Sequence, residues 1–276
     1  RLESITLMAA IAARTKRVGI GVACMASFPS RNPIVLAYQW ASLDVLSGGR
    51  MILGACMGGP ISAQEHRAEY RNMGIRGVDR ALRLEENITI LRKLWTEDRV
   101  NFEGRFHRLE NAFIEPKPVQ SPPPIWVISN PKLGIGKPHI IERSLRRVAQ
   151  MGDGWMTTAN PTNDFKELRR RVLEYAGDYG RSFEDKPCAL YFNINVNEDR
   201  EAAFQETKQY LDQYYSLDFK RGAIENWVAH GSPEQCIQQL QSLVDDGATD
   251  ILLRFPSWDQ EGQFRRCVEE VLPHVQ

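Results

Sequence analysis

The sequence has no long hydrophobic run and no excess of charge of either sign. None of its segments approaches the roughly 18 consecutive apolar residues that a membrane-spanning helix needs. Its 35 lysines and arginines equal its 35 aspartates and glutamates, so no global field favours nucleic acid or an anionic membrane. We therefore expect a small molecule as the partner, and neither nucleic acid nor membrane.

Cysteine is also scarce. The five cysteines are odd in number and widely spaced, with no CxxC pair and no adjacent histidine, so the sequence predicts no zinc or other metal site. This pattern is typical of reduced thiols, and no basic-then-apolar signal segment opens the chain. We expect a cytoplasmic protein.

Apolar runs followed by amphipathic helical patterns repeat along the chain, which is typical of a parallel sheet covered on both faces. A doubly wound sheet needs about six strands and a (β/α)8 barrel needs eight. The chain shows no internal repeat or linker, so we expect one domain over 1–276, with an insertion that carries a hairpin around 98–122. The six predicted strands are 17–25, 51–55, 125–129, 154–159, 188–196 and 250–255.

Local signals fix several helix ends. Asn32 can cap a helix whose first turn holds Pro33, and Ser47-Gly48-Gly49 ends the same helix. Ser232-Pro233-Glu234-Gln235 has the pattern of a capping box. These signals predict helices over 33–47 and from 233 onward.

The segment LDVLSGGRMILGACMGG, residues 43–59, delivers small residues to the end of a buried strand. A tight core strand with a glycine-rich exit explains it, and so does a site where a flat ligand approaches the backbone. Taken alone, this segment leaves both explanations open.

Four blocks, in this order, give the chain a family resemblance: LDVLSGGRMILGACMGG, LRKLWTEDRVNFEGRFHRLENAFIEPKPVQSPPPIWV, RRVAQMGDGWMTT and HGSPEQC. The sequence resembles the bacterial luciferase-like flavin monooxygenases over essentially its whole length. The resemblance implies a TIM (β/α)8-type barrel with a flavin at the C-terminal strand ends. Family members carry a strand, a helix and a strand before the point where this chain begins, so we expect an N-terminally incomplete barrel.

The resemblance implies cofactor contacts at two early strand ends. Cys56 falls where luciferase has a reactive cysteine near the flavin, and Met57 replaces an arginine that contacts the flavin phosphate there. Gly58 belongs to the same loop. Ala23 and Cys24 end the preceding strand, where the family often has a non-prolyl cis peptide beneath the ring. An ordinary strand end with two small core residues is the alternative.

Further cofactor contacts are implied after the third predicted strand. Ser129 and Asn130 match a family position that meets the flavin phosphate. The loop PKLGIGKPH follows and leads into a helix, and free N–H groups at a helix start attract phosphate. Gly134 and Gly136 are therefore candidate contacts, although a surface loop explains them equally well.

Substrate contacts are weaker candidates. Tyr191 and Asn193 share one face of a predicted strand, and Arg254 ends the final strand, where it can bind an anion or pair on the surface. No catalytic residue is assigned, because the family histidine on an early strand has no counterpart in this chain.

The leading interpretation is a monooxygenase that receives reduced FMN from a separate flavin reductase and uses O2 to oxidise a small organic substrate. One alternative is a 5-deazaflavin-dependent oxidoreductase that transfers hydride; another is a flavin-binding protein without turnover. The chain has no GxGxxG dinucleotide fingerprint, which agrees with a reductase partner. The resemblance also implies a homodimer formed through helices that flank the early strands.

Overall fold

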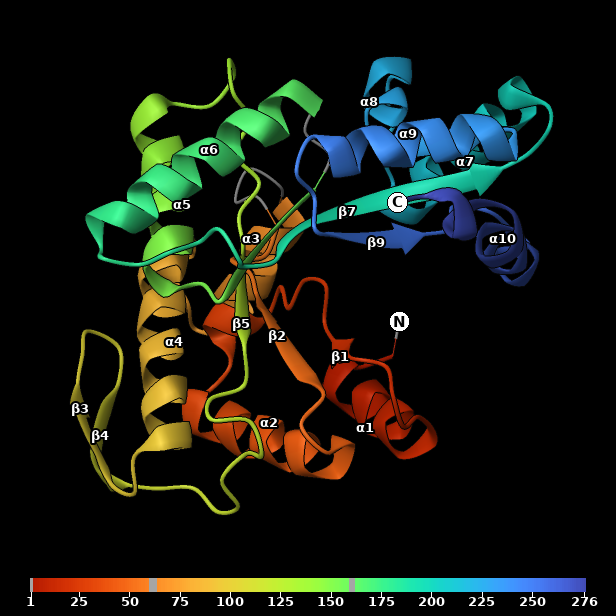
Figure 1. Cartoon of the computed structure of the whole chain (residues 1–276). Coiled ribbons are helices and arrows are strands. Elements are labelled where there is room, and N and C mark those ends of the chain that lie inside the picture. Colours follow the sequence, from red (N-terminus) through yellow and green to blue (C-terminus); the bar gives the residue numbers. More distant parts are fainter. Residues whose placement is uncertain (1, 60–63, 159–161) are drawn as a thin grey trace. The chain divides into compact units, whose positions relative to one another are not determined.

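The computed structural model describes residues 2–59, 64–158 and 162–276. The chain divides into two compact units, one made of residues 1–128 and 150–154 and the other of residues 129–149 and 155–276. Both units contain parallel strands and helices (Figure 1). The expectation of a single domain over 1–276 stays a prediction.

Three parallel strands run through the first unit. Strand β2 (Met51–Ala55) pairs with β1 (Ile20–Gly21) on one edge and with β5 (Ile125–Ile128) on the other. The predicted strands 51–55 and 125–129 are thus confirmed within one residue. The predicted strand 17–25 is wrong in length, because only two residues pair before the ladder breaks at Val22. The Val22 carbonyl oxygen lies 2.1 Å from the position that a Cβ on Gly54 would take, and pairing resumes only as a single bridge at Met25.

One helix of the first unit, α2 (Pro33–Ser47), begins and ends at the predicted signals. The Asn32 side chain accepts the backbone N–H groups of Ile34 and Val35, and Gly48 ends the same helix at a φ of +69°. The antiparallel hairpin falls where it was predicted. Besides its three parallel strands, this unit contains α1 (Ser4–Arg14), α2, α3 (Gln64–Asn72), α4 (Arg80–Thr96), the hairpin strands β3 (Val100–Glu103) and β4 (Arg108–Ala112), and the 3-10 turns η1 (Phe28–Ser30) and η2 (Gly77–Asp79).

Two tryptophans occupy the core of this unit. Trp40 on α2 is fully buried, and Trp95 on α4 is 2 % exposed. The Trp95 indole N–H donates to the Ala37 carbonyl at 3.2 Å, which fixes α4 against α2. Burying such large side chains supplies most of the stabilisation of a core like this one.

The second unit is built around its longest strand, β7 (Cys188–Val196). Strand β7 pairs in parallel with β6 (Gly154–Thr158), β8 (Val228–Gly231) and β9 (Asp250–Arg254). The predicted strand 188–196 is confirmed, and the predicted strand 250–255 is confirmed within one residue. The predicted strand 154–159 is confirmed to Thr158, and its last residue lies outside the described residues. Strand β8 was not predicted, because its four residues show no alternation of apolar and polar side chains.

Helices α7, α8 and α9 lie on one side of β7 and β9 (Figure 1). The capping box is confirmed, since the Ser232 hydroxyl accepts the Gln235 N–H and the Gln235 side chain accepts the Ser232 N–H. The last helix begins at Gln260 and changes pitch at Cys267. The helices are α5 (Pro138–Met151), α6 (Thr162–Asp178), α7 (Arg200–Tyr215), α8 (Arg221–Glu225), α9 (Pro233–Asp245) and α10 (Gln260–Arg266), followed by the π-helical turn η3 (Cys267–Val271) and the 3-10 turn η4 (Leu272–His274).

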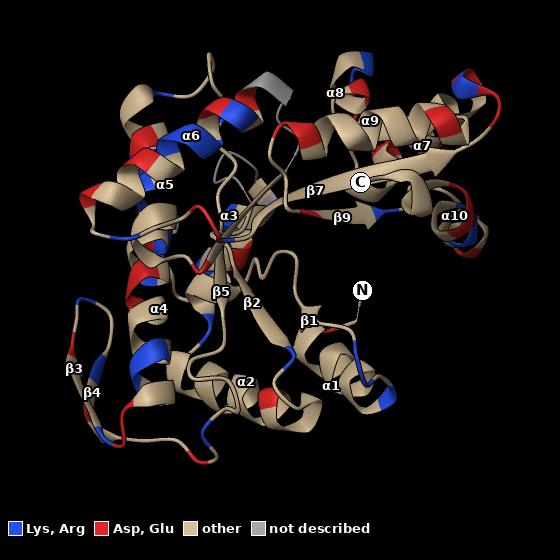
Figure 2. Cartoon of the chain, viewed as in Figure 1, with Lys and Arg blue, Asp and Glu red and all other residues tan. Residues whose placement is uncertain are grey.

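The fold class is α/β with parallel strands, as the sequence predicts. Seven strands of the described residues take part in parallel pairs. The helices carry charges of both signs (Figure 2), in keeping with the balanced composition. Within the same residues, none of the helices combines the length and the apolar character needed to cross a membrane.

Candidate functional site

The loop that follows β2 in the first unit is held in place by two neighbouring helices. The Met57 carbonyl accepts the Tyr70 hydroxyl of α3 at 2.8 Å and Arg80 Nη1 of α4 at 3.0 Å. Arg80 Nη1 also donates to the Gly59 carbonyl. An arginine therefore reaches this loop although Met57 occupies the position of the family arginine. Sequence reasoning missed Tyr70 and Arg80, which no local pattern links to the loop.

Glycine is required in this loop by the packing of the protein itself. Gly58 has a φ of +78°, and a Cβ there would lie 2.0 Å from the Tyr70 hydroxyl oxygen and 2.7 Å from the Ala26 carbonyl oxygen. These contacts explain the glycine without a ligand. The implied cofactor contact at Gly58 stays a prediction.

Cys24 and Cys56 meet beside this loop. Their Sγ atoms lie 2.6 Å apart; Cys24 is exposed, and Cys56 is 7 % exposed. The Gly58 N–H donates to Cys56 Sγ at 3.3 Å. The Cys24 thiol, the Gly58 N–H and the nearby Arg80 charge lower the pKa of Cys56, although burial opposes them. The hydrogen bond that the Cys24 thiol donates to Cys56 raises the pKa of Cys24.

The expectation of a non-prolyl cis peptide at Ala23–Cys24 is wrong. Among the described residues, the cis peptide bonds are Glu115–Pro116 and Ser121–Pro122. The Cys24 carbonyl instead accepts the Ala26 N–H at 3.0 Å in a tight turn, so the chain reverses here without a cis bond. The implied cofactor contacts of Ala23 and Cys24 stay predictions.

In the second unit, Ser129 and Asn130 each have a side-chain donor without a partner among the described residues. The Ser129 backbone is fully used, since its N–H donates to the Met156 carbonyl and its carbonyl accepts the Trp155 indole. Asn130 Oδ1 accepts the Thr158 N–H at 2.8 Å, which fixes the amide. The Ser129 hydroxyl and the Asn130 side-chain NH2 bond to no described residue. Two oriented donors of this kind suit a phosphate.

The loop between Asn130 and α5 is exposed. Gly134 has a φ of +76°, and nothing lies within 4 Å of the position that a Cβ would take there, so a turn requires this glycine and packing does not. The Gly136 N–H donates to the Lys132 carbonyl at 3.0 Å. Neither glycine is tied to a ligand by these contacts, and their implied phosphate contacts stay predictions.

Arg254, at the C-terminal end of β9, stands among aromatic side chains of α7. Its guanidinium carbon lies 3.8 Å from the centre of the Tyr214 ring, and Nη1 donates to the Tyr215 hydroxyl at 3.1 Å. Arg254 forms no ion pair with a carboxylate in the described part of the chain, and its buried Nη2 has no hydrogen-bond partner there. A partly buried cation without a counter-ion can hold an anionic or aromatic group. The Tyr210 ring centre lies 5.6 Å from the same guanidinium carbon. The three tyrosines were missed, although their i, i+4, i+5 spacing on α7 is visible in the sequence.

Tyr191 and Asn193 lie within β7, not at its end. The Tyr191 ring meets Trp227 edge to face at 6.0 Å, and burial raises the pKa of Tyr191. Asn193 is fully buried, its Nδ2 donates to the Trp227 carbonyl at 3.0 Å, and its Oδ1 has no partner among the described residues. Both side chains thus support the packing of Trp227, and their substrate contacts stay predictions.

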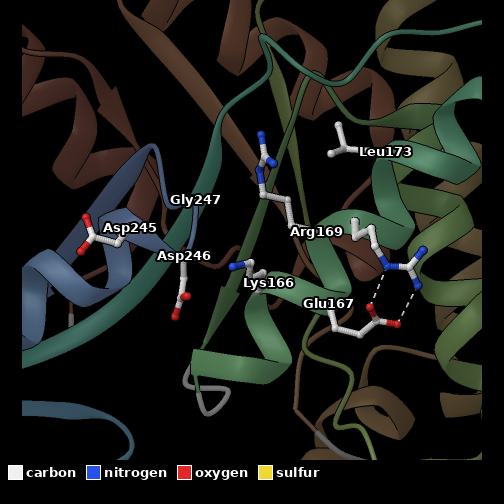
Figure 3. A pocket seen from close by; sticks show the side chains of 8 residues that line it. Lys166, Glu167, Arg169, Leu173, Asp245, Asp246 and Gly247 are labelled. Atoms are coloured by element: carbon white, nitrogen blue, oxygen red, sulfur yellow. Dashed lines mark hydrogen bonds and ion pairs between the residues drawn. The ribbon is translucent and has the colours of Figure 1, made fainter.

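A hollow of about 540 Å³ lies elsewhere in the second unit (Figure 3). Its charges offset one another, and Glu167 pairs with both Arg170 and Arg171. It contains none of the residues predicted from the sequence. Its lining consists of Lys166, Glu167, Arg169, Arg170, Leu173, Asp245, Asp246 and Gly247.

The part of the chain that the structure describes contains no group of three or more histidine, cysteine, aspartate or glutamate side chains that could hold an ion. The donors that the structure does present are hydroxyl, amide, thiol and guanidinium groups, which suit an organic ligand.

Comparison with known proteins identifies the family. The family model described as luciferase-like monooxygenase matches residues 1–250. The chain belongs to the luciferase-like monooxygenase family. Within this family, it is 26% identical over 296 residues to an F420-dependent glucose-6-phosphate dehydrogenase of Amycolatopsis mediterranei (strain U-32), covering 99% of this chain and 84% of the relative. A protein of the same description from Gordonia bronchialis is 26% identical over 99% of this chain and 82% of its own length.

Solved structures confirm the luciferase-like TIM-barrel fold. An F420-dependent secondary alcohol dehydrogenase in complex with an F420-acetone adduct matches with a TM-score of 0.81 at 18% identity, over 100% of this chain and 84% of that one. The monooxygenase RslO1 from Streptomyces bottropensis matches with a TM-score of 0.79 at 23% identity, over 99% of this chain and 83% of that one.

Proposed function

We propose that this luciferase-family protein is an oxidoreductase that transfers hydride between a 5-deazaflavin of the F420 type and a small organic substrate. The observation that carries this proposal is the description of the similar curated proteins: F420-dependent dehydrogenases that align with almost the whole chain. They favour the deazaflavin alternative over the FMN monooxygenase that was the leading interpretation of the sequence.

The chain offers groups that fit such a cofactor. Within the described residues, the Ser129 hydroxyl and the Asn130 side-chain NH2 have no hydrogen-bond partner and can donate to a phosphate, and Thr158 already orients Asn130 through Oδ1. When bound, a deazaflavin supplies hydride transfer. Arg254 would orient an anionic or aromatic part of a ligand, because no carboxylate neutralises it within the described residues. The role of the protein is therefore to bind and orient the cofactor and the substrate.

Binding under anaerobic conditions tests the cofactor. The protein is titrated separately with F420 and with FMN, each in oxidised and reduced form, and fluorescence follows binding. The proposal expects F420 to bind at least tenfold more tightly than FMN, and expects F420 reduction when substrates such as glucose 6-phosphate or secondary alcohols are screened. Preference for FMN contradicts it, and tight F420 binding without reduction by any substrate supports a binding protein without turnover.

The two donors are tested by substitution. Ser129→Ala removes a donor to the phosphate, and Asn130→Asp replaces a donor by a negative charge that repels the phosphate. We expect each variant to lower the affinity for F420 about tenfold, in keeping with the ~1.4 kcal/mol that a charge-assisted hydrogen bond provides. Ser182→Ala, at an exposed serine of the same unit, is the matched control and leaves affinity unchanged. Equal affinity in all three variants removes Ser129 and Asn130 from the site.

An FMN monooxygenase is the second candidate, because RslO1 and the EDTA monooxygenase EmoA from Chelativorans sp. BNC1 share the fold. This function needs reduced FMN, for which we propose a separate flavin reductase as partner. Its test is oxygen consumption with FMN, NADH and an added reductase. Substrate-dependent consumption that exceeds the reductase alone favours this candidate, and its absence favours hydride transfer.

A further inference from the structure

Two thiols, one from the segment after β1 and one at the end of β2, meet in the first unit. Cys24 Sγ and Cys56 Sγ lie 2.6 Å apart, about 0.6 Å more than the ~2.04 Å of a disulfide bond. The other three cysteines, Cys188, Cys236 and Cys267, are each buried within the second unit. The pair is thus the one place in the described chain where two thiols are in contact.

The backbone explains why the two sulfurs meet. Cys24 immediately precedes Met25, and Cys56 immediately follows Ala55; Met25 and Ala55 form a parallel bridge. Strands β1 and β2 approach closely because neighbouring glycines have no side chain: a Cβ on Gly21 would lie 2.7 Å from the Ile52 carbonyl oxygen. The backbone therefore holds the two thiols in contact, and the contact does not depend on the conformation of flexible side chains alone.

The surroundings favour a thiolate on Cys56. Cys56 Sγ accepts the Cys24 S–H and the Gly58 N–H, and Arg80 contributes positive charge. Thiolates, not thiols, react with peroxides and disulfides. Cys24 is exposed, so a small oxidant can approach the pair. The arrangement provides one nucleophilic sulfur and one resolving thiol beside it.

We propose that Cys24 and Cys56 form a redox-sensitive thiol pair that hydrogen peroxide converts to an intramolecular disulfide. This modification site does not depend on which cofactor binds, because it rests on the contact between the two sulfurs and on the groups around them.

The chemistry balances with peroxide as the named oxidant. The Cys56 thiolate attacks peroxide, so that an S–O bond forms, the O–O bond breaks and hydroxide leaves. The Cys24 sulfur then attacks the Cys56 sulfenic acid; the S–S bond forms, the S–O bond breaks, and the departing oxygen leaves as water. The two thiols lose two electrons and two protons, and peroxide becomes two molecules of water.

Peptide mapping under non-reducing conditions tests the proposal. The folded protein is treated with hydrogen peroxide, free thiols are alkylated, and trypsin releases residues 18–31 and 51–67, which contain Cys24 and Cys56. We expect these two peptides to be joined by a link that dithiothreitol cleaves, and we expect the number of free thiols per monomer to fall from five to three. Persistence of five free thiols, or links that involve the buried cysteines of the second unit instead, overturns the proposal.

Single variants separate the two roles. In Cys24→Ser, Cys56 loses its resolving partner, so peroxide produces a sulfenic acid that dimedone labels. In Cys56→Ser, we expect no linked peptide and little dimedone label on Cys24. Cys236→Ser is the matched control and still forms the linked peptide. If dimedone labels Cys24 in Cys56→Ser as strongly as it labels Cys56 in Cys24→Ser, the assignment of roles is wrong. Circular dichroism shows whether each variant is folded.

Discussion

At the residue scale, the candidate site depends on contacts that no local pattern encodes. The sequence motif singles out Cys56 and Gly58, and the end of a predicted strand singles out Arg254. The sequence does not indicate that Cys24 touches Cys56, or that Tyr214 stacks on Arg254, because both contacts join residues far apart in the chain. The resemblance to a family selects positions, and only the folded backbone brings their atoms together.

Gly58 provides the first test at this scale. Gly58→Ala places a Cβ at 2.0 Å from the Tyr70 hydroxyl oxygen and at 2.7 Å from the Ala26 carbonyl oxygen, in addition to the cost of a φ of +78°. We expect it to lower the free energy of unfolding by about 2–4 kcal/mol, combining left-handed strain with overpacking. Urea denaturation measures the change.

Gly74→Ala is the matched control for Gly58→Ala. Gly74 has a similar φ of +69°, but nothing lies within 4 Å of its Cβ position. Its substitution therefore costs only the conformational part, about 1 kcal/mol. Equal losses at the two positions would show that backbone conformation alone requires glycine at Gly58.

At the element scale, predictability follows the range of the interactions. Helix α2 and the start of α9 were predicted correctly because their caps are satisfied within three residues of the helix end. Strand β1 was predicted too long and β8 was missed, because their extent depends on pairing with β2 and β7. A four-residue strand that is buried along its whole length carries no alternating pattern.

The burial of β8 predicts a pH dependence. His230 on β8 is 2 % exposed, and its Nδ1 lies 3.2 Å from the Val228 carbonyl oxygen. Burial lowers the pKa of His230. Below about pH 6.5, the usual histidine pKa, the unfolded chain takes up a proton that the folded chain does not. Stability is therefore retained above this pH and falls as the pH decreases, by at most about 1.4 kcal/mol per unit.

Substitution isolates this contribution. His230→Gln removes the titrating group, so we expect a flatter dependence of the free energy of unfolding on pH between about 7 and 5. His274→Gln replaces an exposed histidine in η4, so in this variant we expect the free energy of unfolding to depend on pH as steeply as in the natural protein. Chemical denaturation at several pH values measures both, and identical slopes in the two variants exclude His230 as the source.

At the scale of the whole molecule, family and fold class are easier to establish than chemistry. Ordered sequence blocks identify the family, and the alternation of strands and helices identifies the α/β class. The cofactor was harder to predict, because relatives that share the barrel use F420 or act as monooxygenases. The fold supplies strand ends, and we propose that a few side chains at them, such as Ser129, Asn130 and Arg254, decide which cofactor and substrate bind.

The outer face of α2 predicts an assembly of two copies. Val35, Tyr38, Val45 and Leu46 form an apolar stripe along this helix, with exposed fractions of 54%, 39%, 43% and 69%. Because the opposite face is packed in the core, α2 is apolar on both sides, which is typical of a helix covered by a partner. We propose a homodimer through this face. Sedimentation velocity should show a dimer at micromolar concentration.

Charge placed on the stripe should separate the two copies. In Leu46→Asp, a carboxylate would have to be buried in the interface without a partner, which costs several kcal/mol, so we expect the monomer to predominate at the same concentration. Leu217→Asp is the matched control, because Leu217 is 58% exposed but lies after α7 in the second unit. A natural protein that sediments as a monomer contradicts the proposal. A Leu46→Asp variant that remains dimeric places the interface elsewhere, since an uncompensated charge at its centre would not be tolerated.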